Sequence, residues 1–295
     1  GSLVLAGGYH VVHDYTRALR YEVRNPESSI TENFLPFQNE YSVEPKTDDQ
    51  GRYYEIFWDN AIPQLAFDAW AINFDGTAYE NGEYPFWASA TLPGRSVSLR
   101  QADEVVEEGR KSEITMGGAV EAVKGGMAGL SLNLITGTYR FDRVFEEIDT
   151  ENAITGSEPP LNFDALTYTE TLETDLVGVN ARGGFTTDLF AGFRAGVFLE
   201  TPTGYSLTDE FRKKVETLFD DGALKEAGGQ GDDPGNGRFE YSLRTPWRFG
   251  GGLSYELGGI QLAADLLYVD WSQMRFDASD SESYFDEVNR RIRSE

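Results

Sequence analysis

A repeated alternation of apolar and polar residues is the feature of this sequence that most constrains its fold. The clearest case is 246–257, where Trp247, Phe249, Leu253 and Leu257 share one parity and glycine, serine and charged residues share the other. Successive side chains of a β-strand point to opposite sides of the sheet, so a period of two indicates a strand with one apolar face. We therefore expect an all-β protein whose sheet has faces of different polarity.

The same pattern recurs along the chain and predicts seven long strands. They cover residues 2–13, 112–123, 129–139, 164–180, 188–200, 246–257 and 260–271. Each has roughly ten or more residues, whereas strands of soluble proteins average about 5–6. Roughly 9–11 residues cross a bilayer at a tilt. The strand length therefore favours a transmembrane antiparallel β-barrel.

The predicted connections alternate between short and long. Tight, glycine-bearing turns are expected at Gly125-Gly126, Arg182-Gly183-Gly184 and Gly258-Gly259, and long outer loops at about 14–111, 143–163, 201–237 and 277–295. Outer-membrane barrels combine short periplasmic turns with long outer loops. We therefore expect residues 1–295 to form one partial barrel domain with helical outer loops.

Local signals place helices within these loops. Ser29-Ile30-Thr31-Glu32 has the spacing of a capping box, in which the serine and glutamate side chains satisfy backbone donors at a helix start. Residues 52–74 are rich in aromatic and aliphatic side chains, and Pro63 is expected to divide that run. Residues 207–219 predict an amphipathic helix capped at Thr208.

The ligand-binding candidates come from the apolar loop segment and from two arginines on polar strand faces. A large apolar surface in an outer loop predicts either a ligand groove or packing of the segment on its own barrel mouth. The arginines either attract a carboxylate head group or pair with acids such as Glu121, Glu256 and Asp265. The candidates are Phe57, Trp58, Ile62, Leu65, Phe67, Trp70, Phe74, Arg194 and Arg248.

The charge of the chain limits its partners. It has 50 acidic and 25 basic residues, for a formal net charge of −25. Such a field repels polyanions, which excludes a nucleic-acid partner bound by phosphate neutralisation. Only 6 of the basic residues are lysine. High acid with little lysine indicates a halophile, and the alternative is an ordinary acidic outer surface.

Several kinds of catalytic and metal site have no sequence signal. The chain has no cysteine, so disulfides and thiolate sites are excluded. No P-loop, GxSxG, HExxH or dinucleotide fingerprint occurs. His10 and His13 are expected on opposite faces of a strand, and the acidic segments 232–236 and 277–286 lack EF-hand spacing. We expect neither enzyme activity nor a cofactor or metal.

Four segments carry a family resemblance. They are residues 7–34, 65–74, 194–211 and 245–276, of which 194–211, with Thr201-Pro202-Thr203-Gly204-Tyr205, is the most specific. Together they resemble the FadL/TodX family of outer-membrane transporters for hydrophobic compounds. The resemblance implies a 14-stranded barrel plugged by an N-terminal hatch, with an apolar helix at 65–74. The hatch and the first and last strands have no counterpart here, so we expect the middle portion of a larger barrel.

The expected function is passive uptake of long-chain fatty acids or other hydrophobic compounds across the bacterial outer membrane. The resemblance also implies capture of the compound in an outer-loop groove. We expect a monomer in contact with outer-membrane lipid or detergent. The alternatives are a non-transporting barrel, such as an adhesin or a structural porin-like protein, and a lipase-type outer-membrane enzyme.

Overall fold

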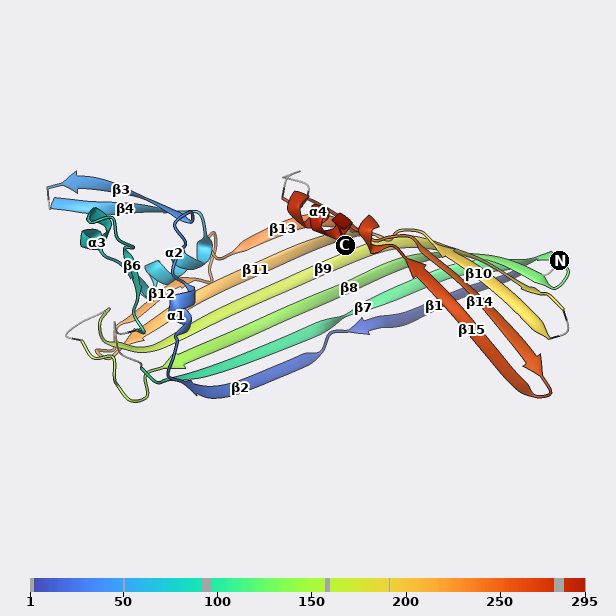
Figure 1. Ribbon diagram of the computed structural model, residues 1–295, viewed down its shortest axis with the longest axis horizontal. Helices are drawn as coiled ribbons and strands as arrows, with labels where there is room; N and C mark the ends of the chain where they lie inside the picture. The colour runs from blue at the N-terminus through green and yellow to red at the C-terminus, as the bar shows by residue number, and fades with distance from the viewer. Residues whose placement is uncertain are drawn as a thin grey trace.

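The computed structural model describes residues 3–49, 51–91, 97–156, 160–190, 192–278 and 284–294. Parts of the predicted strands 2–13 and 188–200, and of the predicted loops 14–111, 143–163 and 277–295, lie outside the described residues. Most of the described chain forms one antiparallel sheet of 12 strands, curled into a half-barrel (Figure 1). Its strands are β1 Leu3–Asp14, β2 Arg17–Asn25, β7 Leu99–Val123, β8 Gly126–Ile148, β9 Phe163–Asp188, β10 Phe193–Glu200, β11 Gly204–Phe219, β12 Leu224–Gly228, β13 Gly237–Arg244, β14 Arg248–Leu257, β15 Ile260–Val269 and β16 Arg275–Ala278. The path through the sheet runs β1-β7-β8-β9-β10-β14-β15. The all-β prediction is confirmed at this level.

Several strands of the sheet continue others across short breaks. β2 pairs with β7 beyond β1, and β11 pairs with β9 beyond β10. Pro202 and Pro246 lie in two neighbouring breaks, where proline has no N–H for the ladder. The flanking threonines rejoin the two strands, because Thr245 N donates to Thr203 O at 3.0 Å and Thr203 N donates to Thr245 Oγ1 at 2.9 Å.

Residues 29–91 form a cap that lies over one end of the long strands (Figure 1). Its elements are α1 Ile30–Asn33, β3 Tyr41–Asp48, β4 Gly51–Trp58, α2 Ala61–Asp68, β5 Ile72–Phe74, α3 Gly76–Glu80 and β6 Phe86–Ala88, while η1 Trp271–Gln273 and α4 Asp286–Ser294 lie near the C-terminus. Leu65, Ile72 and Phe86 of the cap share one buried cluster with Phe145 and Val215 of the wall. We call the face of the sheet that carries the cap the inner face, and this end of the strands the cap end.

Of the cap helices, α1 begins where the sequence predicts, whereas α2 both begins and ends before the predicted helix does. Ser29 caps α1 with the expected capping box, in which its hydroxyl accepts from Thr31 N at 3.0 Å. The helix predicted over 65–74 is wrong, because α2 ends at Asp68 and the chain continues as β5. Trp70 adopts a φ of 58°, a left-handed conformation that closes a helix end. Pro63 lies in the first turn, where proline is tolerated and does not divide the segment.

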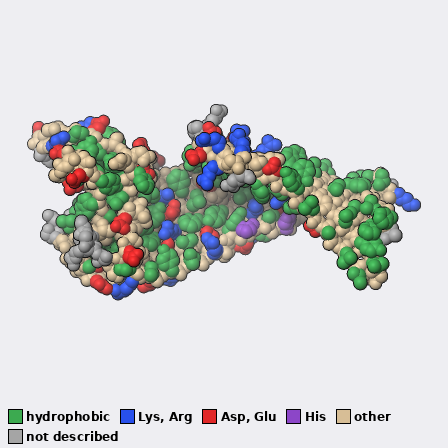
Figure 2. All heavy atoms as spheres, in the orientation of Figure 1, with side chains coloured by type: hydrophobic (Ala, Val, Ile, Leu, Met, Phe, Trp, Pro, Cys, Tyr) green, Lys and Arg blue, Asp and Glu red, His purple; other side chains and the backbone are tan. Residues whose placement is uncertain are grey.

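At the end of the sheet farthest from the cap, the far end, the outer face is apolar. Strand register places a set of large apolar residues on this face, each between 38% and 78% exposed. They are Leu3, Leu5, Tyr9, Val11, Ile114, Met116, Val120, Leu130, Leu132, Leu134, Val177, Val179, Val197, Leu199, Phe249, Leu253, Leu257, Ile260, Leu262, Leu266 and Tyr268. We call them the apolar band. Among the described residues, no charged side chain lies between them on that face. Figure 2 shows apolar side chains over β14 and β15 at this end of the molecule.

At the cap end the polarity of the two faces is reversed. On the inner face, Leu99, Phe145 and Val215 are buried under the cap. The outer face of the same strands carries charged side chains, including Arg140, which pairs with Glu173 at 2.7 Å. Because β8 and β9 are continuous through the change, the apolar set switches parity within an unbroken strand.

Three sequence predictions fail because long strands occupy the predicted loops and turns. Residues 207–219 are not a helix but part of β11, which pairs with β9 on one side and β13 on the other. Arg182-Gly183-Gly184 is not a turn but the interior of β9. The predicted loops at 14–111, 143–163 and 201–237 contain β2, the first half of β7, the end of β8 and β11. The turns at Gly125 and Gly258-Gly259 are confirmed, with positive φ at each glycine.

Candidate functional site

A row of polar side chains crosses the inner face near the level of the strand breaks. It comprises His10, Glu113, Thr115, Asn133, Asn180, Arg182, Glu200, Thr203 and Arg248. We call these residues the polar belt. They lie between the small-residue surface of the far end and the apolar surface under the cap.

Strand register brings the belt together. Arg182 lies directly opposite Glu200 on the neighbouring strand, and Glu200 lies opposite Arg248 on the next. Asn133 lies opposite Asn180 in the same way. Directly opposed residues point to the same face with their Cβ atoms about 4.5–5.5 Å apart. The belt is thus a set of cross-strand pairs from sequence segments far apart.

Hydrogen bonds between side chains run through the centre of the belt. Thr115 Oγ1 donates to Asn133 Oδ1 at 2.9 Å, and Asn133 Nδ2 donates to Asn180 Oδ1 at 2.6 Å. Asn180 Nδ2 then donates to Thr203 Oγ1 at 2.7 Å. Both asparagines and Thr203 are buried. Each buried amide therefore has the partner that burial requires, which fixes the orientation of the belt.

Ion pairs occupy the flank of the belt on β9, β10 and β14. Glu200 contacts Arg182 Nε at 2.8 Å and Arg248 Nη1 at 3.7 Å, and Arg182 Nη1 also reaches Glu113 at 3.6 Å. Both carboxylate side chains are 8% exposed, whereas the two guanidinium side chains are 38% and 43% exposed. The two pairs of opposite charges cancel, and the two arginine side chains remain partly exposed on the inner face.

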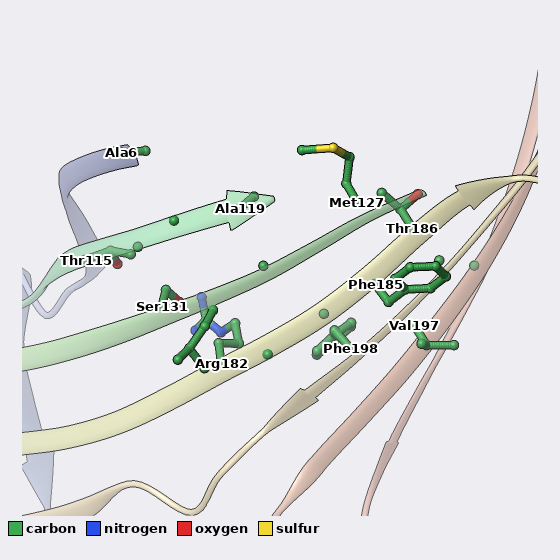
Figure 3. A pocket seen from close by; sticks show the side chains of 18 of the residues that line it. Ala6, Thr115, Ala119, Met127, Ser131, Arg182, Phe185, Thr186, Val197 and Phe198 are labelled. Carbon is green, nitrogen blue, oxygen red and sulfur yellow. The ribbon is translucent and has the colours of Figure 1, made fainter. Parts of the chain in front are cut away.

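Two hollows adjoin the belt on the inner face. Toward the far end lies a trough of about 960 Å³, whose wall is lined mainly by small residues such as Thr115, Gly117, Ser131 and Gly184, with Arg182 at its edge (Figure 3). Small side chains leave this wall thin and the trough wide.

Toward the cap lies a second hollow of about 460 Å³. Belt residues line one side of it, and Ile135, Leu176, Leu207 and Leu243 line the other. This arrangement sets charged and apolar groups side by side within one space. The hollow therefore has the chemistry to hold a molecule with one polar end and one apolar part.

The aromatic and aliphatic candidates from the sequence lie in the cap and do not line either hollow. Leu65 is buried at 1% exposure, and Trp58, Ile62, Phe67 and Phe74 pack against the same core. Phe57 and Trp70 are more exposed, at 45% and 38%. Trp70 contacts Phe219 of the wall at 6.3 Å between ring centroids and holds Lys225 Nζ 4.1 Å from its ring. This segment thus packs on its own wall. Of the sequence candidates, Ile62 is the one that borders a cavity of about 450 Å³ beneath the cap, as far as the described residues show.

The two candidate arginines lie in different places. Arg248 belongs to the belt, whereas Arg194 lies at the far tip of the sheet and pairs with Asp188 at 2.8 Å. Among the described residues, Glu121, Glu256 and Asp265 form no ion pair with either arginine. Sequence reasoning missed Arg182, Glu113 and Glu200. The sequence prediction places Arg182 in a turn, and the two glutamates pair with Arg182 only through the register of the sheet. Continuing the alternation of β9 through its glycines places Arg182 on the polar face.

The two histidines lie on the same face, contrary to the sequence prediction. A bulge between Val11 and His13 shifts the register, so that His10 opposes Glu113 and His13 opposes Lys111, both on the inner face. Figure 2 shows both histidines, in purple, on one side of the molecule. His10 Nε2 lies 3.9 Å from Glu113 Oε1. Within the described ranges, no three acidic or histidine side chains are placed to hold a metal.

Comparison with known proteins gives no family for this chain. No family model, no curated protein and no solved structure matches it. No helix among the described residues has both the length and the apolar character needed to cross a membrane.

Proposed function

We propose that this chain forms part of the wall of a bacterial outer-membrane β-barrel. The barrel would take up long-chain fatty acids or other hydrophobic compounds by passive diffusion. The apolar band carries the proposal, because it is exposed, continuous from β1 to β15 and free of charge among the described residues. Exposed apolar patches on soluble monomers rarely exceed about 300–600 Å². Lipid around the band removes the cost of leaving it in water, roughly 25 cal/mol per Å².

The inner face supports transport over a purely structural or adhesive role. The trough gives room along the wall, and the second hollow combines the belt with Leu176, Leu207 and Leu243. An amphiphile would rest its apolar part on these leucines and its polar end against the belt. The open edges of Arg182 and Arg248 are suited to a carboxylate head group.

Uptake by cells that express the gene tests this function. Ser131→Trp places a bulky ring on the inner face beside the trough, and we expect slower uptake of labelled fatty acid. Leu132→Trp is the matched control, since its side chain lies on the outer face of the same strand and an apolar ring suits that face. Uptake equal to that of empty-vector cells for every apolar substrate tried would reject transport and favour the adhesive or structural barrel.

A further inference from the structure

Lys111 is a half-buried lysine that has no partner within the described part of the chain. It lies on β7 and lines the second hollow together with belt residues. Among the described residues it forms no ion pair, hydrogen bond or ring contact. Lysine is rarely buried unless an acid pairs with it, because burial takes its charge away from water. The unpaired charge of Lys111 therefore requires an explanation in a chain with 50 acidic residues.

The other half-buried lysines of the described chain each have a partner. Lys46, Lys213 and Lys214 contact glutamates at 2.7, 3.4 and 2.8 Å, respectively. Lys225 lies over an aromatic ring, with its Nζ 4.1 Å from the ring centroid. The lack of a partner is thus not a general property of lysines at this degree of burial in the molecule.

Two acids on the same face of β7 as Lys111 are engaged by other cations. Arg182 Nη1 lies 3.6 Å from Glu113 Oε1, and Arg17 Nη2 lies 2.8 Å from Glu107 Oε1. Thr115 Oγ1 also donates to Glu113 Oε1, at 3.1 Å. Neither carboxylate is therefore left to neutralise the lysine.

The charged groups that line the second hollow do not balance. Three cations face two carboxylates, so the lining carries one net positive charge with histidine neutral, as far as the described residues show. The arginines of the belt pair with its two glutamates, which leaves the lysine as the group without a counter-charge. Complementarity then favours an anionic group in the hollow. The five residues are Lys111, Arg182, Arg248, Glu113 and Glu200.

Strand register places an apolar row beside Lys111 on the inner face. Lys111 lies opposite Gly137 of β8, and Gly137 lies opposite Leu176 of β9. Leu176 in turn lies opposite Leu207 of β11. A Cβ at Gly137 would lie 3.4 Å from Leu176 Cγ, so the glycine leaves a gap between the lysine and the leucines. With strands about 4.8 Å apart, the row from the lysine to Leu207 spans roughly 14 Å.

We propose that Lys111 binds the head group of an anionic amphiphile in the second hollow. Its ammonium group would pair with the carboxylate, and the apolar chain would cross Gly137 and rest on Leu176 and Leu207. The proposal rests on the proposed function and deepens it, because it assigns the head-group contact to one residue and the chain to one row. The charges of the belt arginines are already offset by glutamates, so Lys111 provides the larger share of the attraction.

Binding of a fluorescent long-chain fatty acid and of its methyl ester, by the whole chain folded in a neutral maltoside detergent, tests this assignment. Lys111→Met removes the charge and keeps an apolar stem. We expect the Kd for the acid to rise about ten-fold or more and the Kd for the ester to change less than about two-fold, because only the acid has the charged contact. Lys111→Arg should keep the preference for the acid. Lys124→Met, in the exposed turn after β7, is the matched control and should change neither Kd.

Leu176→Gln tests the other end of the same row. It should weaken binding of the acid and the ester alike, because it removes apolar contact from the chain that both compounds share. An equal loss for acid and ester in Lys111→Met, an unchanged Kd for the acid, or no binding of either compound by the unaltered chain would overturn the assignment. If cells carrying Lys111→Met take up the acid at the unaltered rate and binding is unchanged, the assignment fails while transport itself stands.

Discussion

At the far end of β8, Leu132 faces outward and Ser131 faces inward; at the cap end of the same strand, Glu146 faces outward and Phe145 faces inward. Backbone pairing is the same at both ends. What differs is the surroundings of each face, because the cap covers the inner face at one end and leaves it hollow at the other. The apolar side of a strand therefore depends on what covers that side, and it can change within one strand.

The largest expected effect comes from a substitution in the buried core of the cap. Leu65→Ala removes a side chain that is 1% exposed, and we expect a loss of about 2–5 kcal/mol in the stability of the cap. Hydrogen exchange of α2 would measure it. Phe57→Ala, at a side chain 45% exposed, is the control and should cost much less. Equal losses would mean that the cap has no dominant core.

A charge placed on the apolar band tests the far end. Leu132→Arg should lower the free energy of unfolding from lipid vesicles by about 2–4 kcal/mol, the cost of arginine on the lipid face of a barrel. Thr171→Arg adds the same charge to the outer face at the cap end and should cost about 0–1 kcal/mol. If both substitutions lower the free energy of unfolding equally, the outer face has the same surroundings at both ends of the strands.

Removing a belt arginine tests the boundary between the ends. Arg182→Leu leaves Glu113 and Glu200, both 8% exposed, without their shared partner. We expect a loss of about 1–3 kcal/mol in unfolding free energy, typical of an unsatisfied charged group. Arg194→Leu removes an exposed ion pair instead and should cost about 0–1 kcal/mol. The reverse order would show that the belt is not a structural element.

The smallest expected effect is a pH dependence at the cap end. Glu147 is fully buried against Ser29 and Gln101, and burial raises the pKa of its carboxyl above 4.5. The folded state then holds this proton more tightly than the unfolded state, so its contribution to stability decreases as pH rises above 4.5 through the raised pKa. Glu147→Gln should flatten that part of the curve of unfolding free energy against pH. An unchanged slope would assign it to other groups.

Alternation in the sequence predicted the strands where their apolar parity is constant. Leu130, Leu132 and Leu134 indicate β8, but the prediction stopped at residue 139, while the strand continues to Ile148. It stopped because the apolar residues change parity there, at Tyr139 and Phe145. Only knowledge of the cap explains that change, and the cap is a tertiary feature that no local pattern contains.

The candidate site was predictable only in part, for similar reasons. Arg248 was found because it lies in a cleanly alternating strand. Arg182 was not predicted as a site residue, because the two glycines that follow it have the sequence pattern of a turn. In the structure both glycines lie within β9. Leu65 is buried because it packs against the wall. An apolar run in the sequence predicts such packing and a ligand groove equally well.

A single-cysteine accessibility experiment tests the reversal of polarity most directly, because the chain has no cysteine of its own. Leu132→Cys, Ser131→Cys and Glu146→Cys would each be labelled with a fluorophore, reconstituted in lipid vesicles and exposed to lipid-soluble and water-soluble quenchers. We predict that the lipid-soluble quencher acts on the probe at 132 and the water-soluble one on those at 131 and 146. Quenching of position 132 by the aqueous agent, or of position 146 by the lipid-soluble one, would show that the outer face does not change polarity along β8.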